Sequence, residues 1–477
     1  MTVSPITRVT GGVAGLAATY AAVRALADRF DAAGDHLRDH AAADARVLTE
    51  PDLLESAPLS PVTFAEAEAR VLDASAGIHG ALEASVTYEA DALLVRATVT
   101  AYEECDRLVA SSFEVIDYAV GRDVGYAVAA AAPSLLLLGL AAGPTWDHLP
   151  AGARRRLGDT VQEWAEEHPE AVQHGVDATG GLLDGLLAGL PAGLPVVSWL
   201  AGFAAFHPTA GDAAADLAAL YPNEGPPAVR RRHDLAVPLA DVPPRDLTGL
   251  IRHLDQVSLL SPPDRPGDAG TIEVQSLDAP DGTVRHVVYL PGTDDFAPAP
   301  WEHHGDVRDL PGDLHAIVGD HTTYAAGIEQ AMTEAGIRPH EPVLLVGHSL
   351  GGLEAASLLA HGSGFDVTHV VTAGSPLGGV HGYPAGTHVL SLENRGDLVP
   401  LLDGRDNADT TQQVTVQFDD HETSMVGNHG LQHYLRGAAA ADASADPSVR
   451  EQLDSLRTAG FLGSDDPTTG RVFQISR

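Results

Sequence analysis

The sequence predicts an α/β protein in which an all-α N-terminal half precedes a mostly parallel β-sheet flanked by helices. Alanine and leucine recur at three- and four-residue steps through most of residues 8–220, a pattern typical of packed helices. Beyond residue 270 the apolar residues alternate, as they do in β-strands. Short apolar runs then take turns with helical stretches, and this order favours parallel strands joined by crossover helices.

Composition limits the classes of function. A chain of 477 residues is too long for one ordinary core, so two or three domains are expected. Acidic residues outnumber basic ones by 66 to 28, and the net charge of −38 would repel a phosphate backbone, so we expect no nucleic-acid partner. Every basic residue is arginine, which excludes lysine Schiff-base chemistry. Cys105 is the only cysteine and leaves no intrachain disulfide or multi-cysteine metal site.

Residues 1–122 are predicted to form a long helical hairpin. Two helical runs, 8–46 and 64–120, are separated by a proline-bearing break at 49–61. The second run carries an apolar stripe, formed by Val71, Ile78, Leu82, Val86, Leu93 and Ala97. A two-helix hairpin must cover such a stripe, so the hairpin is a candidate binding site for a protein partner.

Residues 123–220 form a second helical region rich in alanine, leucine and glycine, and residues 221–245 form a proline-rich linker. The apolar stretches 125–143 and 179–206 consist of near-neutral alanine and glycine or are broken by Asp184 and prolines, so we expect buried helices and no transmembrane anchor. Residues 1–10 lack the features of a secretory signal. The expected location is the cytoplasm, or outside the cell after export without a signal peptide.

Residues 246–437 are predicted to form the α/β domain, and residues 438–477 a C-terminal tail without recognisable chemistry. A helix opens at Asp246, and the Asp281-Gly282 pair supplies the turn of a β-hairpin. An apolar helix, Tyr324 to Gly336, leads to the next strand. The strands expected after it are 342–346, 368–373, 387–392 and 413–418, with a closing helix from about 430.

One motif sits between a strand and a helix of this domain. The apolar run 342–346 stops at Gly347-His348-Ser349-Leu350-Gly351, and helical spacing follows. A serine at such a turn occupies a strained backbone conformation, and glycines two residues before and after it prevent clashes. The context favours a nucleophile elbow with Ser349 in the turn between the strand and the helix. The alternative is a glycine-rich turn with a chance serine.

A serine nucleophile needs a base that is oriented by an acid. In the expected chain order the acid follows a later strand, which favours Asp397, with Glu393 and Asp403 as rivals. Three histidines follow the last strand, namely His421, His429 and His433. His429 is favoured as the base because a loop before the closing helix can bring its ring to the serine, while His421 and His433 remain alternatives.

The tetrahedral intermediate of such a reaction needs two backbone N–H donors. Leu350, directly after the serine, and Thr293, after an early strand, are the expected oxyanion donors. Residues 294–320 are expected to form a flap over the site. No ligand spacing recurs among the 23 histidines, so neither a metal nor a cofactor is expected.

Several motifs together resemble the class 3 lipase branch of the α/β-hydrolases. They are Gly347–Gly352, Thr372–Pro376, Asn394 with Asp397–Pro400, and His429, and they occur in family order over about 272–435. The resemblance implies an α/β-hydrolase domain that cleaves carboxyl esters through an acyl-enzyme, as a lipase or esterase acting on a small-molecule or lipid ester. The family usually has a tyrosine shortly after its histidine, whereas Tyr434 lies five residues beyond His429 and directly follows His433.

The N-terminal hairpin is loosely similar to the helical-hairpin substrates of type VII secretion. Tyr102 to Asp106 fits their Y-x-x-x-[DE] export signal, although a tyrosine and an acid four residues apart also arise in ordinary amphipathic helices. This resemblance implies a second hypothesis: a secreted effector or interaction protein whose hairpin binds a partner. Its hydrolase domain would then be a phospholipase-like payload or a non-catalytic scaffold.

Overall fold

The computed structural model describes residues 5–148, 174–189, 206–219, 221, 225–262, 265–294, 305–420 and 425–477. The chain divides into two compact units. The first contains Leu16–Ser111, and the second contains Met1–Gly15 together with Ser112–Arg477.

The first unit is a helical hairpin. It contains α1 (Leu16–Val47), α2 (Pro51–Ser56), α3 (Pro61–Ala76) and the N-terminal part of α4 (Ala81–His148). Ion pairs of 2.6 Å join Arg24 to Glu103 and Arg96 to Asp28, so α1 and α4 run antiparallel. The helix expected over 64–120 is interrupted, since α3 ends at Ala76 and α4 begins at Ala81. Glycines at 77 and 80 bracket the break because they stabilise a helix poorly.

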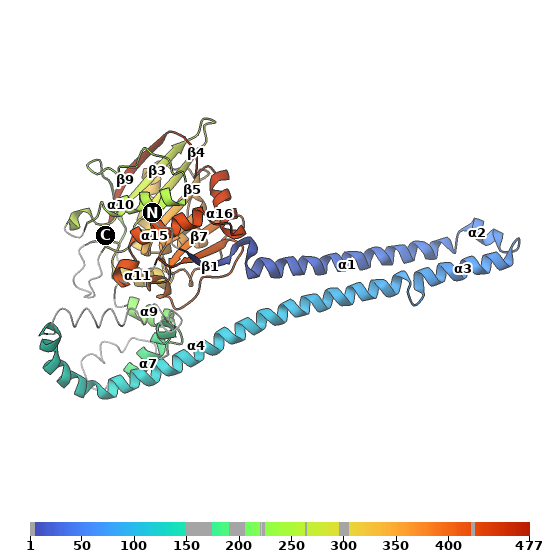
Figure 1. Cartoon of the computed structure of the whole chain (residues 1–477), viewed down its shortest axis with the longest axis horizontal. Coiled ribbons are helices and arrows are strands. Elements are labelled where there is room, and N and C mark those ends of the chain that lie inside the picture. The colour runs from blue at the N-terminus through green and yellow to red at the C-terminus, as the bar shows by residue number, and fades with distance from the viewer. Residues whose placement is uncertain are drawn as a thin grey trace. The chain divides into compact units, whose positions relative to one another are not determined.

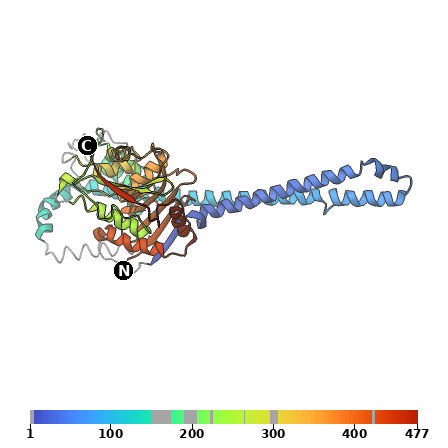
Figure 2. The same cartoon turned by 90° about the horizontal axis from the view of Figure 1, so that it is seen from above.

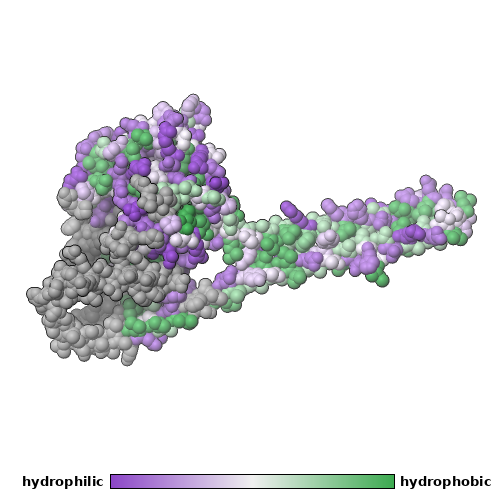
Figure 3. Space-filling view, viewed as in Figure 1, coloured by the Kyte–Doolittle hydropathy of each residue, from purple (hydrophilic) through white to green (hydrophobic). Residues whose placement is uncertain are grey.

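The apolar stripe expected on the hairpin is largely exposed. Ile78 is 81% exposed, Val86 65% and Leu93 66%. Figure 3 shows hydrophobic residues along the surface of this unit, interspersed with hydrophilic ones. The packing of α1 against α4 therefore leaves much of the predicted stripe uncovered within the unit.

The second unit contains a nine-stranded mixed sheet in the order β1-β8-β7-β6-β5-β4-β3-β9-β2 (Figure 1). Strands β4 to β8 are parallel, whereas β1, β2, β3 and β9 pair with their neighbours in antiparallel fashion. The strands are β1 (Ile6–Gly11), β2 (Ala228–Arg231), β3 (Thr271–Asp278), β4 (Val284–Leu290), β5 (Pro342–His348), β6 (Asp366–Ala373), β7 (His388–Asn394), β8 (Gln413–Phe418) and β9 (Thr468–Ser476).

Helices cover both faces of the sheet (Figures 1 and 2). Helices α10 (Leu247–Ser258), α15 (Leu431–Asp442) and α16 (Pro447–Thr458) pack on one face, and α12 (Thr323–Glu334) and α13 (Leu350–His361) on the other. Val287 and Tyr289 of β4 enter the first core, and Val288 and Leu290 the second. This alternation follows from the two-residue repeat of a strand.

Smaller elements complete the unit. Among the described residues, the remaining α-helices are α7 (Thr179–Gly189), α9 (Ala210–Ala218), α11 (Leu310–Ile317) and α14 (Met425–Asn428). The 3-10 helices of these ranges are Gly12–Ala14, Pro266–Asp268 and Val399–Leu401.

The expected α/β class is confirmed, and so are the interior elements of its sheet. The strand expected at 413–418 is β8, and the Asp281-Gly282 turn joins β3 to β4 with Gly282 at φ 85°. Asp246 caps α10 by accepting the N–H of Gly249 at 2.7 Å. These elements are specified locally, by turn and cap residues.

Three segments that were predicted to lie outside the α/β domain contribute strands to its sheet. Residues 6–11, assigned to the hairpin, form β1 and pair with β8. Residues 228–231, assigned to the linker, form β2, and residues 468–476 of the predicted tail form β9, which pairs with β3. These strands are short or distant in sequence from their partners, so local periodicity did not reveal them.

No helix in the described ranges is long and apolar enough to span a membrane.

Candidate active site

Ser349 occupies the sharp turn between β5 and α13. Its backbone has φ 53° and ψ −124°, and among the described residues it is the only non-glycine residue with positive φ. Such a conformation costs on the order of 1–3 kcal/mol and persists where surrounding contacts impose it. One such contact is the 3.0 Å hydrogen bond that the Ser349 N–H donates to the carbonyl of Ala373 in the neighbouring strand.

The two glycines of the motif are required by close backbone contacts. A Cβ at Gly347 would lie 2.3 Å from the carbonyl oxygen of Gly351. A Cβ at Gly351 would lie 2.1 Å from the carbonyl oxygen of Leu290 at the end of β4. A larger residue at either position would therefore displace backbone atoms of the turn.

Asp397 and His429 form a hydrogen-bonded pair. His429 Nδ1 lies 2.7 Å from Asp397 Oδ2, and the aspartate is 2% exposed. The carboxylate also accepts the hydroxyl of Tyr434 at 2.6 Å and the N–H of Val399 at 2.9 Å. These contacts fix the carboxylate, and the carboxylate in turn fixes the imidazole, so Nε2 is the nitrogen left for proton transfer.

This pair lies beside the serine turn. His348, which precedes the serine, packs its ring against that of His429 with centroids 4.4 Å apart. Its Nε2 donates a 2.8 Å hydrogen bond to the His429 carbonyl. Burial, followed by the charge of His429, lowers the pKa of His348 to about 3, so its ring is neutral at assay pH. His348 therefore positions His429 and is unsuited to act as a base.

The other predicted candidates have different partners. His433 Nδ1 lies 2.5 Å from Asp420, and His421 lies outside the described residues. Glu393 accepts hydrogen bonds from Asn407 and Gln417, and burial raises its pKa to about 7. Asp403 accepts the N–H of Gly379 at 3.1 Å. Of the three carboxylates weighed as the acid, only Asp397 contacts a histidine in the part of the chain that the structure describes.

Tyr434 was not expected at the site, although its place after the histidines was a signal for it. Its side chain is fully buried on α15, and its hydroxyl lies between Asp397 Oδ2 and the N–H of Asn394. His429 lies in the turn before α15, five residues ahead of Tyr434, and both side chains contact Asp397 Oδ2.

The predicted oxyanion donors flank the serine. A Cβ at Gly292 would lie 2.7 Å from the Cβ of Ser349, so the loop after β4 lies directly against it. The next residue, Thr293, donates its hydroxyl to Asp313 at 2.7 Å, which orients the loop. Burial raises the pKa of Asp313 to about 7. Within the described ranges, neither the Thr293 N–H nor the Leu350 N–H donates a hydrogen bond, so both can donate to a ligand oxygen.

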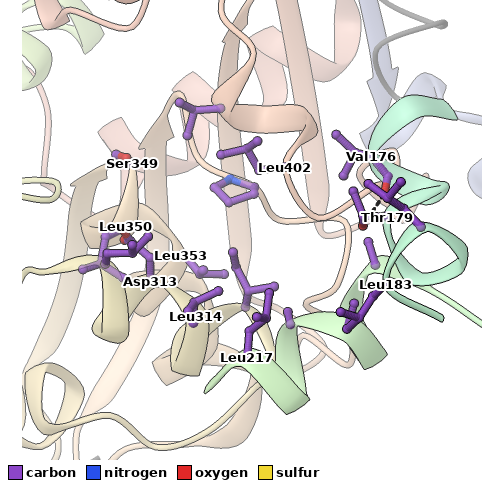
Figure 4. Close-up of a pocket in the computed structure, with 18 residues that line it drawn as sticks. Val176, Thr179, Leu183, Leu217, Asp313, Leu314, Ser349, Leu350, Leu353 and Leu402 are labelled. Atoms are coloured by element: carbon purple, nitrogen blue, oxygen red, sulfur yellow. Dashed lines mark hydrogen bonds between the residues drawn. The ribbon is translucent and has the colours of Figure 1, made fainter. Parts of the chain in front are cut away.

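Ser349 lines a cavity of about 540 Å³ (Figure 4). Its walls come from α7, α9, α11, the start of α13 and the loops after β6 and β7. Of the 18 residues known to line it in the described part of the chain, only Thr179, Asp313 and Ser349 are polar. The others include Val176, Leu183, Ala213, Ala214, Leu217, Leu314, Leu353 and Leu402. A cavity with this lining suits an apolar ligand group.

A buried polar cluster joins two of the wall helices. His207 Nδ1 lies 2.5 Å from Asp184 of α7, and its Nε2 lies 2.8 Å from Asp216 of α9. Tyr118 donates its hydroxyl to Asp184 at 2.8 Å. Both ring nitrogens of His207 are paired, so the cluster stabilises the cavity wall.

The chain matches no protein-family model, and no curated protein or solved structure is significantly similar to it. Any functional conclusion therefore depends on the sequence motifs and on the geometry around Ser349.

Proposed function

We propose that this chain is a serine hydrolase of carboxyl esters built on an α/β-hydrolase fold, with Ser349, His429 and Asp397 as its triad. One observation carries the proposal: the strained Ser349 turn borders an apolar cavity and also lies against the His429–Asp397 pair. Strain at a serine that borders a cavity is typical of a nucleophile elbow.

The proposed reaction proceeds through an acyl-enzyme. Ser349 Oγ attacks the ester carbonyl carbon while His429 accepts the serine proton, and Asp397 stabilises the resulting imidazolium. The N–H groups of Leu350 and Thr293 bind the oxyanion. The intermediate collapses with cleavage of the ester C–O bond, and His429 donates its proton to the departing alcohol oxygen. Water, activated by His429, then releases the acid and restores the serine.

The cavity favours esters with an apolar acyl group. The described residues that line it include no positive side chain that could bind a charged group. Burying each methylene stabilises a bound chain by about 0.8 kcal/mol, so affinity should rise with chain length until the cavity is full.

The test is hydrolysis of p-nitrophenyl butyrate, octanoate and dodecanoate by the wild type and by Ser349→Ala. We expect turnover by the wild type only, with kcat lowered about 10⁶-fold in the variant. A fluorophosphonate probe should label the wild type at Ser349. Wild-type protein that is folded by circular dichroism yet neither hydrolyses any ester nor accepts the probe would refute the enzyme proposal.

We infer a second, separable function for the hairpin: binding of a protein partner, as in export by a type VII-like route. The exposure of Ile78, Val86 and Leu93 favours it. Tyr102, the aromatic residue of the possible export signal, is 60% exposed. In a secreting host, Tyr102→Ala should retain the protein in cells, whereas Leu108→Ala, at a similarly exposed position, should not. Equal secretion of both variants would remove the export hypothesis.

A further inference from the structure

A second group of reactive side chains lies outside the proposed triad. Asp117 of α4 meets His174 and Asp177 of the helical stretch 174–177. One potential ligand atom from each residue lies within 4.8 Å of the other two, and His174 Nδ1 is 2.6 Å from Asp117 Oδ2. No other set of three His, Cys, Asp or Glu side chains in the described ranges meets this condition.

The charges in this group favour a cation. The side chains of Asp117 and Asp177 bring two carboxylates to the same place as one imidazole. No donor among the described residues hydrogen-bonds to the Asp177 carboxylate, and a Cβ at Gly404 would lie 2.1 Å from its Oδ1. The carboxylate is thus held against a loop backbone, near a second carboxylate, without a dedicated partner of its own.

We propose that Asp117, His174 and Asp177 bind a divalent transition metal of the zinc class, with water completing its coordination. One imidazole nitrogen and two carboxylate oxygens form a donor set that zinc accepts, whereas Ca²⁺ takes six to eight oxygens. Ligands of a tetrahedral zinc with bonds of about 2.0 Å lie about 3.3 Å apart. The 2.6 Å contact between His174 and Asp117 would therefore open slightly to admit the ion, and all three ligand atoms already lie within 4.8 Å of one another. His174 and Asp177 are three residues apart on one helical turn and therefore share a face.

The His207 cluster shows why composition alone does not identify such a site. It also contains one histidine and two aspartates, Asp184 and Asp216. There the histidine lies between the carboxylates and uses both ring nitrogens, and Asp184 also accepts the backbone N–H of His207 and the Tyr118 hydroxyl. This cluster is occupied by protein hydrogen bonds and offers no common point for an ion.

The proposed ion would act on the cavity wall. Val176 and Thr179, which flank Asp177 and line the cavity, belong to the same chain stretch as the ligands. Coordination would tie that stretch to α4 through Asp117. The site could not be recognised from the sequence because Asp117 and His174 are 57 residues apart. The side chain of His174 is 44% exposed, so an ion can reach it from solvent.

The test is isothermal titration of ZnCl₂ into the untagged, chelator-stripped full chain. We expect one zinc per wild-type chain with a Kd below about 10 µM. Asp177→Asn should weaken binding at least about tenfold, and so should His174→Ala, whose exposed position tolerates truncation. The matched control is Asp216→Asn, a change in the His207 cluster, which should stay within about threefold of the wild type.

Two further readouts distinguish coordination from a structural role. Co²⁺ should give a visible d–d spectrum with the wild type and Asp216→Asn and lose it with Asp177→Asn. Zinc should raise the melting temperatures of the wild type and of Asp216→Asn, which give the spectrum, and should leave that of Asp177→Asn unchanged. No zinc binding, equal binding by wild type and Asp177→Asn, or a preference for Ca²⁺ would each overturn the proposal.

Discussion

Two histidine–aspartate pairs lie close together in the chain, and only one of them adjoins the serine. His429 pairs with Asp397 at 2.7 Å, and His433 pairs with Asp420 at 2.5 Å. Both aspartate side chains are 1% exposed. A short histidine–carboxylate contact is therefore insufficient to identify a catalytic pair, and the surroundings of each pair must decide.

The two pairs differ in the charge of the groups around the aspartate and in the part of the protein that the histidine contacts. Asp420 also contacts the guanidinium of Arg436 at 3.3 Å, so its negative charge is already partly compensated. The additional donors to Asp397 are the neutral Tyr434 hydroxyl and Val399 N–H, so its full charge remains to stabilise an imidazolium. His429 packs on His348 of the serine turn, whereas His433 belongs to the first turn of α15 and faces the Asp420 loop.

The largest expected difference between the two pairs comes from replacing each histidine in turn. His429→Ala should lower kcat for p-nitrophenyl octanoate by about 10⁵-fold, because the serine loses its base. His433→Ala should change kcat by less than about threefold, because it disrupts only a structural pair. Steady-state kinetics on both folded variants decides, and a larger loss in His433→Ala would exchange their roles.

Replacing the two aspartates tests the same difference between the pairs, with a smaller expected effect. Asp397→Asn should lower kcat by about 10⁴-fold, since an amide can hold the imidazole in the wrong tautomer and cannot stabilise its charge. The matched change Asp420→Asn should leave kcat within about fivefold and act mainly on the melting temperature. Equal kinetic losses would mean that both pairs serve the serine.

The sequence was sufficient for the parts of this comparison that are encoded locally. The Ser349 turn follows from glycines and from the apolar strand before them, and Asp397 and His429 follow later strands in the expected order. Their convergence is a property of parallel strands, whose carboxyl ends meet at one edge. Periodicity alone does not separate His429, which precedes α15, from His433, which lies in the first turn of α15. The sequence favoured His429 because of its place in the loop, and the contact of His429 with His348 supports that preference.

The cavity could not be predicted in this way. Its walls combine α7 and α9, which lie more than 100 residues before the serine, with α11 and the loops after β6 and β7. The sequence of each wall helix predicts an apolar face, but it does not predict which other element that face packs against. The edge strand β1 was missed for a related reason, because six residues beside a long helix carry little periodic signal.

A substitution that fills the cavity beside Ser349 tests whether the acyl chain of the substrate binds there. Ala214 of α9 lines the cavity, and the neighbouring Ala215 is exposed. Ala214→Phe should lower kcat/KM for the dodecanoate ester by about 100-fold and for the butyrate ester far less, since the ring occupies space needed by the long chain. Ala215→Phe is the control and should change neither value. A uniform loss over all chain lengths would indicate damage to the fold instead.

A third buried carboxylate near the serine gives the smallest expected effect. Glu354 of α13 is 1% exposed and accepts the Thr322 hydroxyl, but no histidine among the described residues pairs with it. Burial raises its pKa to about 8. A raised pKa means that the folded state retains a proton that the unfolded state loses above pH 4.5, so its contribution to stability falls as pH rises from 4.5 to about 8.

Glu354→Gln removes that proton equilibrium and keeps the side-chain volume. The wild type should lose at most about 1.4 kcal/mol per pH unit through this group across that window, and the variant should lose correspondingly less. Denaturant melts at pH 5, 6, 7 and 8 measure the two slopes, with the exposed Glu334→Gln as control. Parallel slopes for wild type and Glu354→Gln would show that this carboxyl is already ionised in the folded protein, as a triad acid must be. The contrast between Glu354 and Asp397 would then rest on their hydrogen-bond partners alone.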